Sequence, residues 1–209
     1  MKAYVVENSC LSYNIELLKR KAGDAQIWAV VKGNGYGLGI VPLAQRLAEH
    51  GIDHFCVTEV REAELLRENG FDTAQILMLR SVENAEEINC LIAILTVGSP
   101  QMAALVNEIA AQRADVAEVH VKIDTGMGRF GFLPEDVEGI LRLYREEKHI
   151  AISGIYTHFD CAFNNEARTR AEFAAFQETV QKIRAAGYET GTVHCCNSSA
   201  FLRFPEMHC

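Results

Sequence analysis

The first residues that could carry chemistry lie in the stretch AVVKGNGYGLG, residues 29–39, where an apolar run ends on Lys32 and four glycines follow. A glycine-rich loop can bind phosphate through backbone N–H groups, but neither common phosphate-loop pattern fits. The dinucleotide pattern GxGxxG requires glycine where Leu38 or Ile40 stands, and in the P-loop pattern the lysine follows the glycines. The segment alone therefore gives weak support for a nucleotide site.

Two interpretations of Lys32 remain open at this point. In the first, a glycine-rich turn after a strand carries a solvated lysine. In the second, the amine lies at the edge of an apolar core, where deprotonation is easier, and forms a Schiff base with a carbonyl compound.

Reactive side chains also follow three later apolar runs. Lys122 and Arg129 lie in EVHVKIDTGMGRFGF, His158 lies in YTHFD, and Asn197 and Ser198 lie in HCCNSS. The carboxyl ends of parallel strands carry the site in α/β folds, and in a barrel they all converge. We therefore expect these side chains and Lys32 to form one site.

Other reactive residues nearby have structural interpretations. We expect His120 and His194 to be packed or hydrogen-bonded strand residues, since a strand histidine acts only where substrate reaches it. Asp124 is expected to brace the tight TGMGR turn. Cys161, close to His158, is an alternative nucleophile, but a catalytic thiol needs a positioned base.

The elements that must position these residues alternate along the chain. Apolar, β-branched runs predict strands at 27–31, 54–58, 75–79, 92–97, 117–123, 152–157 and 192–195. The segments between them have apolar residues at i, i+3, i+4 and i+7, which is typical of helices. A further helix is predicted at 10–21, with Asn8 or Ser9 as its N-cap. This pattern indicates a parallel α/β fold of about seven strand-helix units, as a doubly wound sheet or as a barrel one unit short of eight.

Composition narrows the class of protein. The formal net charge of -8 argues against a nucleic-acid surface, and no apolar run is long enough to span a bilayer. The seven cysteines include no CxxC or metal-like spacing, so we expect reduced thiols and no metal site. The N-terminus MKAYVVENSC is too short and polar for a signal peptide, so a cytoplasmic location is expected.

Four segments together resemble the alanine racemases, pyridoxal-phosphate enzymes of the bacterial cell-wall pathway that make D-alanine for peptidoglycan. VVKGNGYGLG resembles that family's VVKANAYGHG, and VHVKIDTGMGRFGF resembles its K-x-DTGMGRxGF segment. GIYTHF and HCCNSSAFLRFPE resemble its GIYTHFA and HxANSAAxLRxPE segments. The matches occur in the family's order and span residues 30–206.

The resemblance implies catalytic roles for Lys32, Arg129 and His158 and an orienting role for Lys122. Lys32 corresponds to the lysine that holds the cofactor as a Schiff base and acts as one racemisation base. Arg129 corresponds to the arginine that binds the cofactor's phenolic oxygen and the substrate carboxylate. Lys122 corresponds to a lysine that is carbamylated in some members and orients that arginine. His158 corresponds to a histidine in the relay behind the second base.

The resemblance also implies how cofactor and substrate bind. Tyr36 and Ser198 correspond to phosphate ligands, and Asn197 to a neighbouring residue that lines the site. Ser198 is expected to begin a helix, where hydroxyl and amide groups bind phosphate well. The substrate class is a small amino acid, alanine or serine, and the family acts as a homodimer.

Departures from the family pattern bear on fold and activity. Gly33 and Gly35 replace alanines, Leu38 replaces a frequent histidine, and HFDCAFNNE replaces HFATADE, which leaves the substrate open. We expect residues 1–209 to be an N-terminal TIM-type (β/α)8-like barrel domain truncated before the eighth strand. The family's C-terminal β domain carries the opposite-face tyrosine base, so a poor racemase is expected. The alternatives are a non-catalytic pyridoxal-phosphate-binding remnant and a decarboxylase-like barrel enzyme with the same cofactor.

Overall fold

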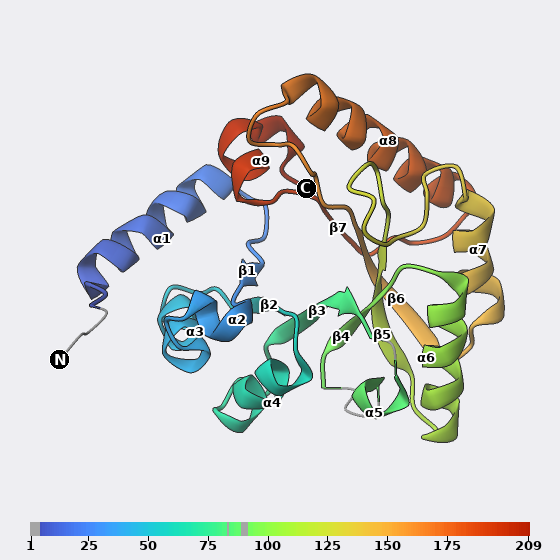
Figure 1. The fold of residues 1–209 in the computed structure, drawn as a ribbon, viewed down its shortest axis with the longest axis horizontal. Helices are drawn as coiled ribbons and strands as arrows, with labels where there is room; N and C mark the ends of the chain where they lie inside the picture. Colours follow the sequence, from blue (N-terminus) through green and yellow to red (C-terminus); the bar gives the residue numbers. More distant parts are fainter. Residues whose placement is uncertain (1–4, 83, 89–91) are drawn as a thin grey trace. The chain divides into compact units, whose positions relative to one another are not determined.

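The computed structural model describes residues 5–82, 84–88 and 92–209 (Figure 1). The chain divides into two compact units, of which the first ends at Leu79 and the second begins at Arg80. Cys90 lies outside the described residues, and the six cysteines that are described are free thiols.

The first unit is built on a short parallel sheet. It contains α1 (Asn8–Ala22), β1 (Ala29–Val30), α2 (Lys32–Tyr36), α3 (Ile40–Glu49), β2 (His54–Val57), α4 (Val60–Glu68) and the start of β3 (Gln75–Ser81). β2 pairs in parallel with β1 and with β3. Phe55 and Val57 of β2, Ala44 of α3 and Leu66 of α4 are fully buried, so the core of this unit lies between its strands and these two helices.

The first helix begins earlier than the sequence predicts. Its N-cap is Glu7, whose carbonyl accepts the Leu11 N–H at 3.0 Å, and no side chain caps the helix. This backbone bond starts the helix before the predicted caps, so Asn8 and Ser9 lie inside α1 and the capping prediction was wrong.

The second unit repeats the alternation of strand and helix. Its elements are α5 (Ala85–Ile88), β4 (Ile94–Val97), α6 (Pro100–Gln112), β5 (Ala117–Lys122), α7 (Val137–Glu146), β6 (Ile150–Tyr156), α8 (Glu166–Ala185), β7 (Thr192–His194), α9 (Ser198–Arg203) and a 3-10 turn, η1 (Pro205–Met207). β5 pairs in parallel with β4 and β6, and β6 pairs with β7. Helix α6 packs against β4, β5 and β6, and α7 contacts both α6 and α8 (Figure 1).

The strand order identifies the fold class. The sheet runs β1-β2-β3-β4-β5-β6-β7, so that each strand neighbours the next in sequence. A doubly wound sheet reverses its order at a switch point, whereas a TIM-type (β/α)8 barrel keeps sequence order throughout. The fold is therefore the predicted incomplete TIM-type α/β barrel, and the described residues include seven strands.

The predicted strands are all present, with small differences at their ends. β1 is reduced to two residues, because only Ala29 and Val30 pair with Phe55 and Cys56 of β2. No helix in the described ranges is long and apolar enough to cross a membrane.

Candidate active site at the strand ends

The loop after β1 is a left-handed turn. Lys32 begins it, and Gly33, Asn34, Gly35 and Tyr36 follow with φ of 62°, 53°, 64° and 52°. L-residues rarely adopt this region because Cβ approaches the following carbonyl, whereas glycine has no Cβ and asparagine tolerates the conformation. The handedness of the turn therefore favours glycine at positions 33 and 35.

Asn34 and Glu62 hold this turn in place. Asn34 Oδ1 accepts the Ile40 N–H at the start of α3, at 2.9 Å, and the Asn34 N–H donates to Glu62 Oε1 at 3.0 Å. Glu62 lies in the first turn of α4, and its Oε2 accepts the N–H groups of Thr58 and Glu59 at 3.0 and 3.2 Å. A buried carboxylate thus joins the loops that follow β1 and β2. The sequence analysis missed Glu62, although an acidic residue in the first turn of a helix was the available signal.

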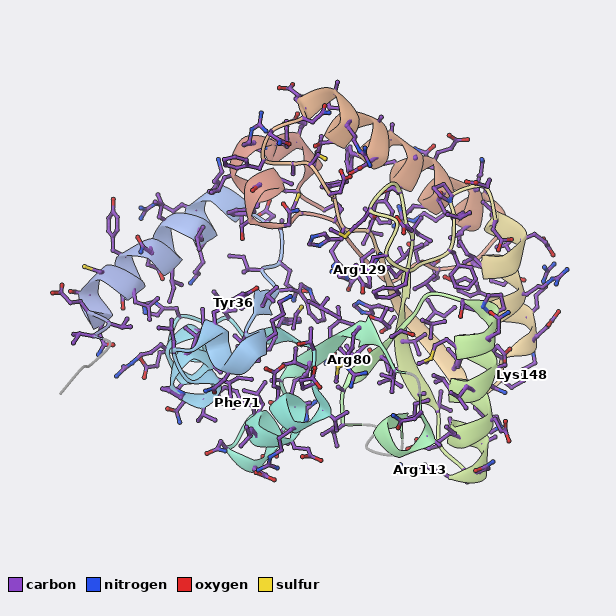
Figure 2. All side chains as sticks on the ribbon, viewed as in Figure 1. Tyr36, Phe71, Arg80, Arg113, Arg129 and Lys148 are labelled. Atoms are coloured by element: carbon purple, nitrogen blue, oxygen red, sulfur yellow. The ribbon has the colours of Figure 1, made fainter. Side chains whose placement is uncertain are left out.

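The side chains of Lys32 and Tyr36 lie on this braced turn. Lys32 is half-buried, and Tyr36 is 67% exposed (Figure 2). Within the described ranges, no protein group is hydrogen-bonded or ion-paired with the Lys32 amine or the Tyr36 hydroxyl. Both groups are available to a ligand at the carboxyl end of β1.

In the second unit, Asp124 braces the turn that carries Arg129. Its carboxylate accepts the N–H groups of Gly126, Gly128 and Arg129 at 3.0 to 3.1 Å. Burial raises the pKa of Asp124, but these bonds and the charge of Lys122 outweigh burial and lower it below its ordinary value. Asp124 therefore has the structural role predicted from the sequence.

The Arg129 side chain is exposed on the β5–α7 loop (Figure 2). Its guanidinium lies 5.9 Å from the centre of the Phe130 ring, and it has no hydrogen-bond acceptor among the described residues. A planar guanidinium without a protein acceptor is suited to bind a carboxylate, phosphate or phenolate ligand.

Lys122 is a buried amine at the end of β5. Its side chain is 1% exposed, and Nζ donates to the Phe130 carbonyl at 2.6 Å and lies 4.6 Å from the centre of the Phe130 ring. The pKa of Lys122 is lowered to about 8: burial lowers it most, the charge of Asp124 opposes the shift, and the charge of Arg129 adds to it. The neutral amine, which is the form that reacts with carbon dioxide, is therefore populated near pH 8.

Side-chain bonds join the ends of β5, β6 and β7. The Thr125 and Thr157 hydroxyls lie 2.8 Å apart, and Asn197 Nδ2 donates to the Phe159 carbonyl at 2.9 Å, next to His158. The three strand ends therefore form one connected edge.

Asn197 also starts the short helix α9. Its Oδ1 accepts the Ala200 N–H at 3.0 Å, so Ser198 is the first helical residue, as predicted. The Ser198 side chain is exposed, and its hydroxyl has no partner among the residues that the structure describes.

Two further histidines lie on β5 and β7, His120 buried and His194 half-buried. His120 Nδ1 and His194 Nε2 lie 3.0 Å apart, and burial lowers their pKa values to about 4 and about 3. Tyr156 stacks on His194 with ring centres 4.8 Å apart, and its hydroxyl lies 3.0 Å from that of Thr96. A Cβ on Gly154 would lie 2.4 Å from His120 Nε2. The histidines are hydrogen-bonded strand residues, as predicted.

Helix α8 clamps the loops that follow β5 and β6, a feature the sequence analysis missed. Arg168 donates to the Gly126 carbonyl at 2.9 Å and pairs with Asp160 at 2.5 Å and Glu172 at 3.2 Å. A hydrogen bond to Asp160 raises the pKa of the Cys161 thiol, which opposes the thiolate form that a nucleophile needs. The arrangement thus favours a structural role for this segment.

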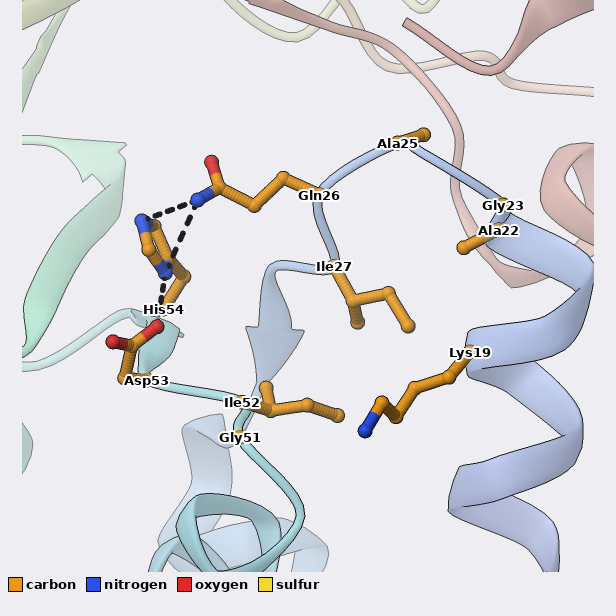
Figure 3. Close-up of a pocket in the computed structure, with 10 residues that line it drawn as sticks. All are labelled: Lys19, Ala22, Gly23, Ala25, Gln26, Ile27, Gly51, Ile52, Asp53 and His54. Atoms are coloured by element: carbon orange, nitrogen blue, oxygen red, sulfur yellow. Dashed lines mark hydrogen bonds and ion pairs between the residues drawn. The ribbon is translucent and has the colours of Figure 1, made fainter.

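A separate hollow of about 190 Å³ lies in the first unit between α1 and the amino ends of β1 and β2 (Figure 3). Gln26 and Asp53 bond to His54 there, at 2.8 and 2.6 Å. The ten described residues that line it include none of the predicted site residues. The hollow is therefore distinct from the edge at the carboxyl ends of the strands.

The chain that carries these strand ends matches a known family. A model of the alanine racemase N-terminal domain matches residues 6–209. The chain belongs to this family. The resemblance drawn from the four sequence segments is thereby confirmed.

Individual relatives support the same assignment. The chain is 34% identical over 209 residues to alanine racemase 1 of Oceanobacillus iheyensis, covering 97% of this chain and 55% of that protein. It is 35% identical over 210 residues to the alanine racemase of Methanococcus maripaludis, covering 97% and 56%. The solved alanine racemase of Clostridium difficile 630 matches with a TM-score of 0.86 at 30% identity, covering 94% of this chain and 56% of that one, and has also been solved in complex with cycloserine. The chain thus spans about half the length of the relatives it matches.

Within this alanine racemase N-terminal domain, the predicted residues fall into two groups. Lys32 and Tyr36 share one loop of the first unit. The other five lie at three successive strand ends of the second unit: Lys122, Arg129, His158, Asn197 and Ser198.

Proposed function

We propose that this chain is the cofactor-binding barrel domain of a pyridoxal-phosphate-dependent racemase. Its substrate would be alanine or a related small amino acid such as serine. The observation that supports this is a set of available donor groups at strand ends, in a chain of the alanine racemase N-terminal family. They are the amine of Lys32, the hydroxyls of Tyr36 and Ser198 and the guanidinium of Arg129, none of which has a hydrogen-bonding protein partner in the described ranges.

This donor set fits pyridoxal phosphate, an aldehyde that carries a phosphate and a phenolic oxygen. Lys32 would bind the aldehyde, Tyr36 and Ser198 would hold the phosphate, and Asn197 would line the site beside them. Arg129 would bind the phenolic oxygen and the substrate carboxylate, because a guanidinium recognises planar anions. When bound, the cofactor supplies the electron sink that makes the substrate α-proton removable.

The remaining roles concern protons and orientation. In the proposal, Lys32 Nζ takes or returns the proton at the substrate α-carbon on one face, and His158 belongs to the relay that serves the other. Lys122, once carbamylated, would become an anion beside Arg129 and orient it. Low turnover by these 209 residues is part of the proposal, since only one face has an assigned base.

The proposal also covers the use of the product, the oligomeric state and the location of the protein. D-alanine would be used for peptidoglycan, and the enzyme would act as a homodimer. A cytoplasmic location agrees with the free thiols of the six described cysteines, since reduced cysteines are usual in that compartment.

The experiment that tests this function uses the purified chain with pyridoxal phosphate. We expect the visible absorbance of a lysine-bound cofactor, which disappears in Lys32→Ala and persists in Lys21→Ala, an exposed lysine of α1. Chiral chromatography after incubation with L-alanine and L-serine measures racemisation and substrate preference. Cofactor binding without turnover would favour the non-catalytic alternative, and absence of binding by the unmodified chain would refute the proposal.

A further inference from the structure

Glu62 makes more bonds than a helix cap requires. Its carboxylate accepts the N–H groups of Thr58 and Glu59, which are close in sequence and immediately precede α4. Its other oxygen accepts the N–H of Asn34, which lies in a different loop. The side chain is 8% exposed, so little water competes for these bonds.

The bond to Asn34 lies at the strained part of the Lys32 turn. Asn34 and Tyr36 are the two residues of this turn that have a Cβ and a positive φ. Such conformations persist only where the surrounding structure holds them. The second support is Asn34 Oδ1, which accepts the Ile40 N–H.

We propose that Glu62 is a positioning residue for Lys32: its carboxylate holds the left-handed turn and so fixes where the amine projects from the end of β1. The role of Lys32 in this inference rests on the proposed function, whereas the hydrogen bond between Glu62 and Asn34 does not depend on that function. A charged acceptor forms stronger bonds to N–H groups than a neutral one does, which suits a carboxylate in this position.

Substitutions at position 62 distinguish the bond to Asn34, which braces the Lys32 turn, from the bonds to Thr58 and Glu59, which cap α4. Glu62→Gln keeps the shape but has one acceptor oxygen and an NH2 group that faces a donor. Glu62→Asp keeps the charge but is one methylene shorter. We expect it still to accept the nearby N–H groups of Thr58 and Glu59 but not to reach the Asn34 N–H. Glu64→Gln, on the exposed face of the same helix, is the matched control.

Amide hydrogen exchange, followed residue by residue by NMR, tests the brace without cofactor. In Glu62→Asp we expect exchange at the Asn34 amide to accelerate roughly tenfold or more, because it loses a charge-assisted bond, while Thr58 and Glu59 remain protected. Glu64→Gln should leave all three amides unchanged. Unchanged exchange at Asn34 in both position-62 variants would overturn the proposal and leave Glu62 as a cap alone. If Glu62→Gln does not fold, the Glu62→Asp result decides.

A second readout concerns Lys32 itself. With pyridoxal phosphate added, both position-62 variants should form the lysine-bound absorbance roughly tenfold more weakly or slowly than the unmodified chain, by the same loss of a charge-assisted bond. Equal binding by all variants would overturn the positioning role even if exchange changed. Absence of binding by the unmodified chain would refute the proposed function, while the exchange result would still decide the brace.

Discussion

At the scale of single residues, burial disfavours the protonated form of the Lys122 amine. Its pKa is lowered to about 8, whereas the same amine in an unfolded chain titrates near 10.5. Between these two values the unfolded chain holds a proton that the folded chain has lost. The free energy of unfolding should therefore rise with pH across this window.

The test is a series of urea unfolding experiments in buffer free of carbon dioxide, which prevents carbamylation. We expect Lys122 to contribute a rise of about 3 kcal/mol between pH 8 and 10.5, from 1.36 kcal/mol per pKa unit. Lys122→Met should remove this contribution, and Lys182→Met, an exposed ion-paired lysine of α8, should keep it. An identical pH dependence in both variants would contradict the assignment.

At the scale of elements, the turn after β1 depends on two glycines in different surroundings. Both have a positive φ, but a Cβ at Gly33 would meet no atom within 4 Å, whereas at Gly35 it would lie 3.3 Å from Ile40 N and Leu43 Cδ2. A side chain at position 33 would therefore cause backbone strain alone, whereas one at position 35 would cause strain and steric crowding.

Alanine substitution at each glycine measures the two effects. Gly33→Ala should destabilise by about 1 kcal/mol, the net of left-handed strain and the reduced entropy of the unfolded chain. Gly35→Ala should lower the free energy of unfolding by roughly 1–2 kcal/mol more than Gly33→Ala does, because Ile40 and Leu43 must shift. Urea unfolding midpoints followed by circular dichroism provide the comparison, and equal losses would show that crowding at Gly35 is unimportant.

The same loop shows what sequence reasoning reached and what it missed. The apolar run ending on Lys32 predicted a strand end, because burial patterns are local, whereas the reactive role of Lys32 came from the family resemblance and stays a prediction. The glycines indicated conformational freedom, but their spacing does not specify the handedness of the turn. The bond from Asn34 to Glu62 joins loops that follow different strands, and no local pattern reports such a contact. The clamp of Arg168 on the Gly126 loop was missed for the same reason.

At the scale of the whole molecule, the alternation of strands and helices predicted a parallel α/β fold but left a doubly wound sheet and a barrel open, and the family resemblance favoured the barrel. Seven apolar runs predicted seven strands, but crossover connections occur in both folds, so the strand order was known only from the structure. The division at Leu79 has no equivalent signal, since β3 runs through it without a break in composition.

Stability at low pH is also a property of the whole molecule, and we expect it to depend on the hydrogen-bonded pair of His120 and His194. Their pKa values are lowered to about 4 and about 3, against 6.5 for unperturbed histidine. Below pH 6.5 the unfolded chain gains protons that the folded chain does not bind. The free energy of unfolding should therefore fall as the pH decreases from 6.5 towards 4.

Urea unfolding at several pH values measures this loss. His120→Asn keeps a hydrogen-bonding side chain without a titrating group, so we expect it to reduce the slope by roughly half, since one of two coupled groups is removed. His149→Asn, at a half-buried position bonded to the Asp115 carbonyl, is the control. The same slope in His120→Asn and the unmodified chain would contradict a role for the pair.

The glycine beside this pair has an evolutionary consequence. Gly154 leaves the volume that the His120 ring fills, since an added Cβ would lie 2.4 Å from Nε2. The identity of one residue thus limits the choices at the other, and the two positions should covary among homologues. A lineage that gains a side chain at 154 must already have a smaller residue at 120, so the order of these two substitutions is constrained.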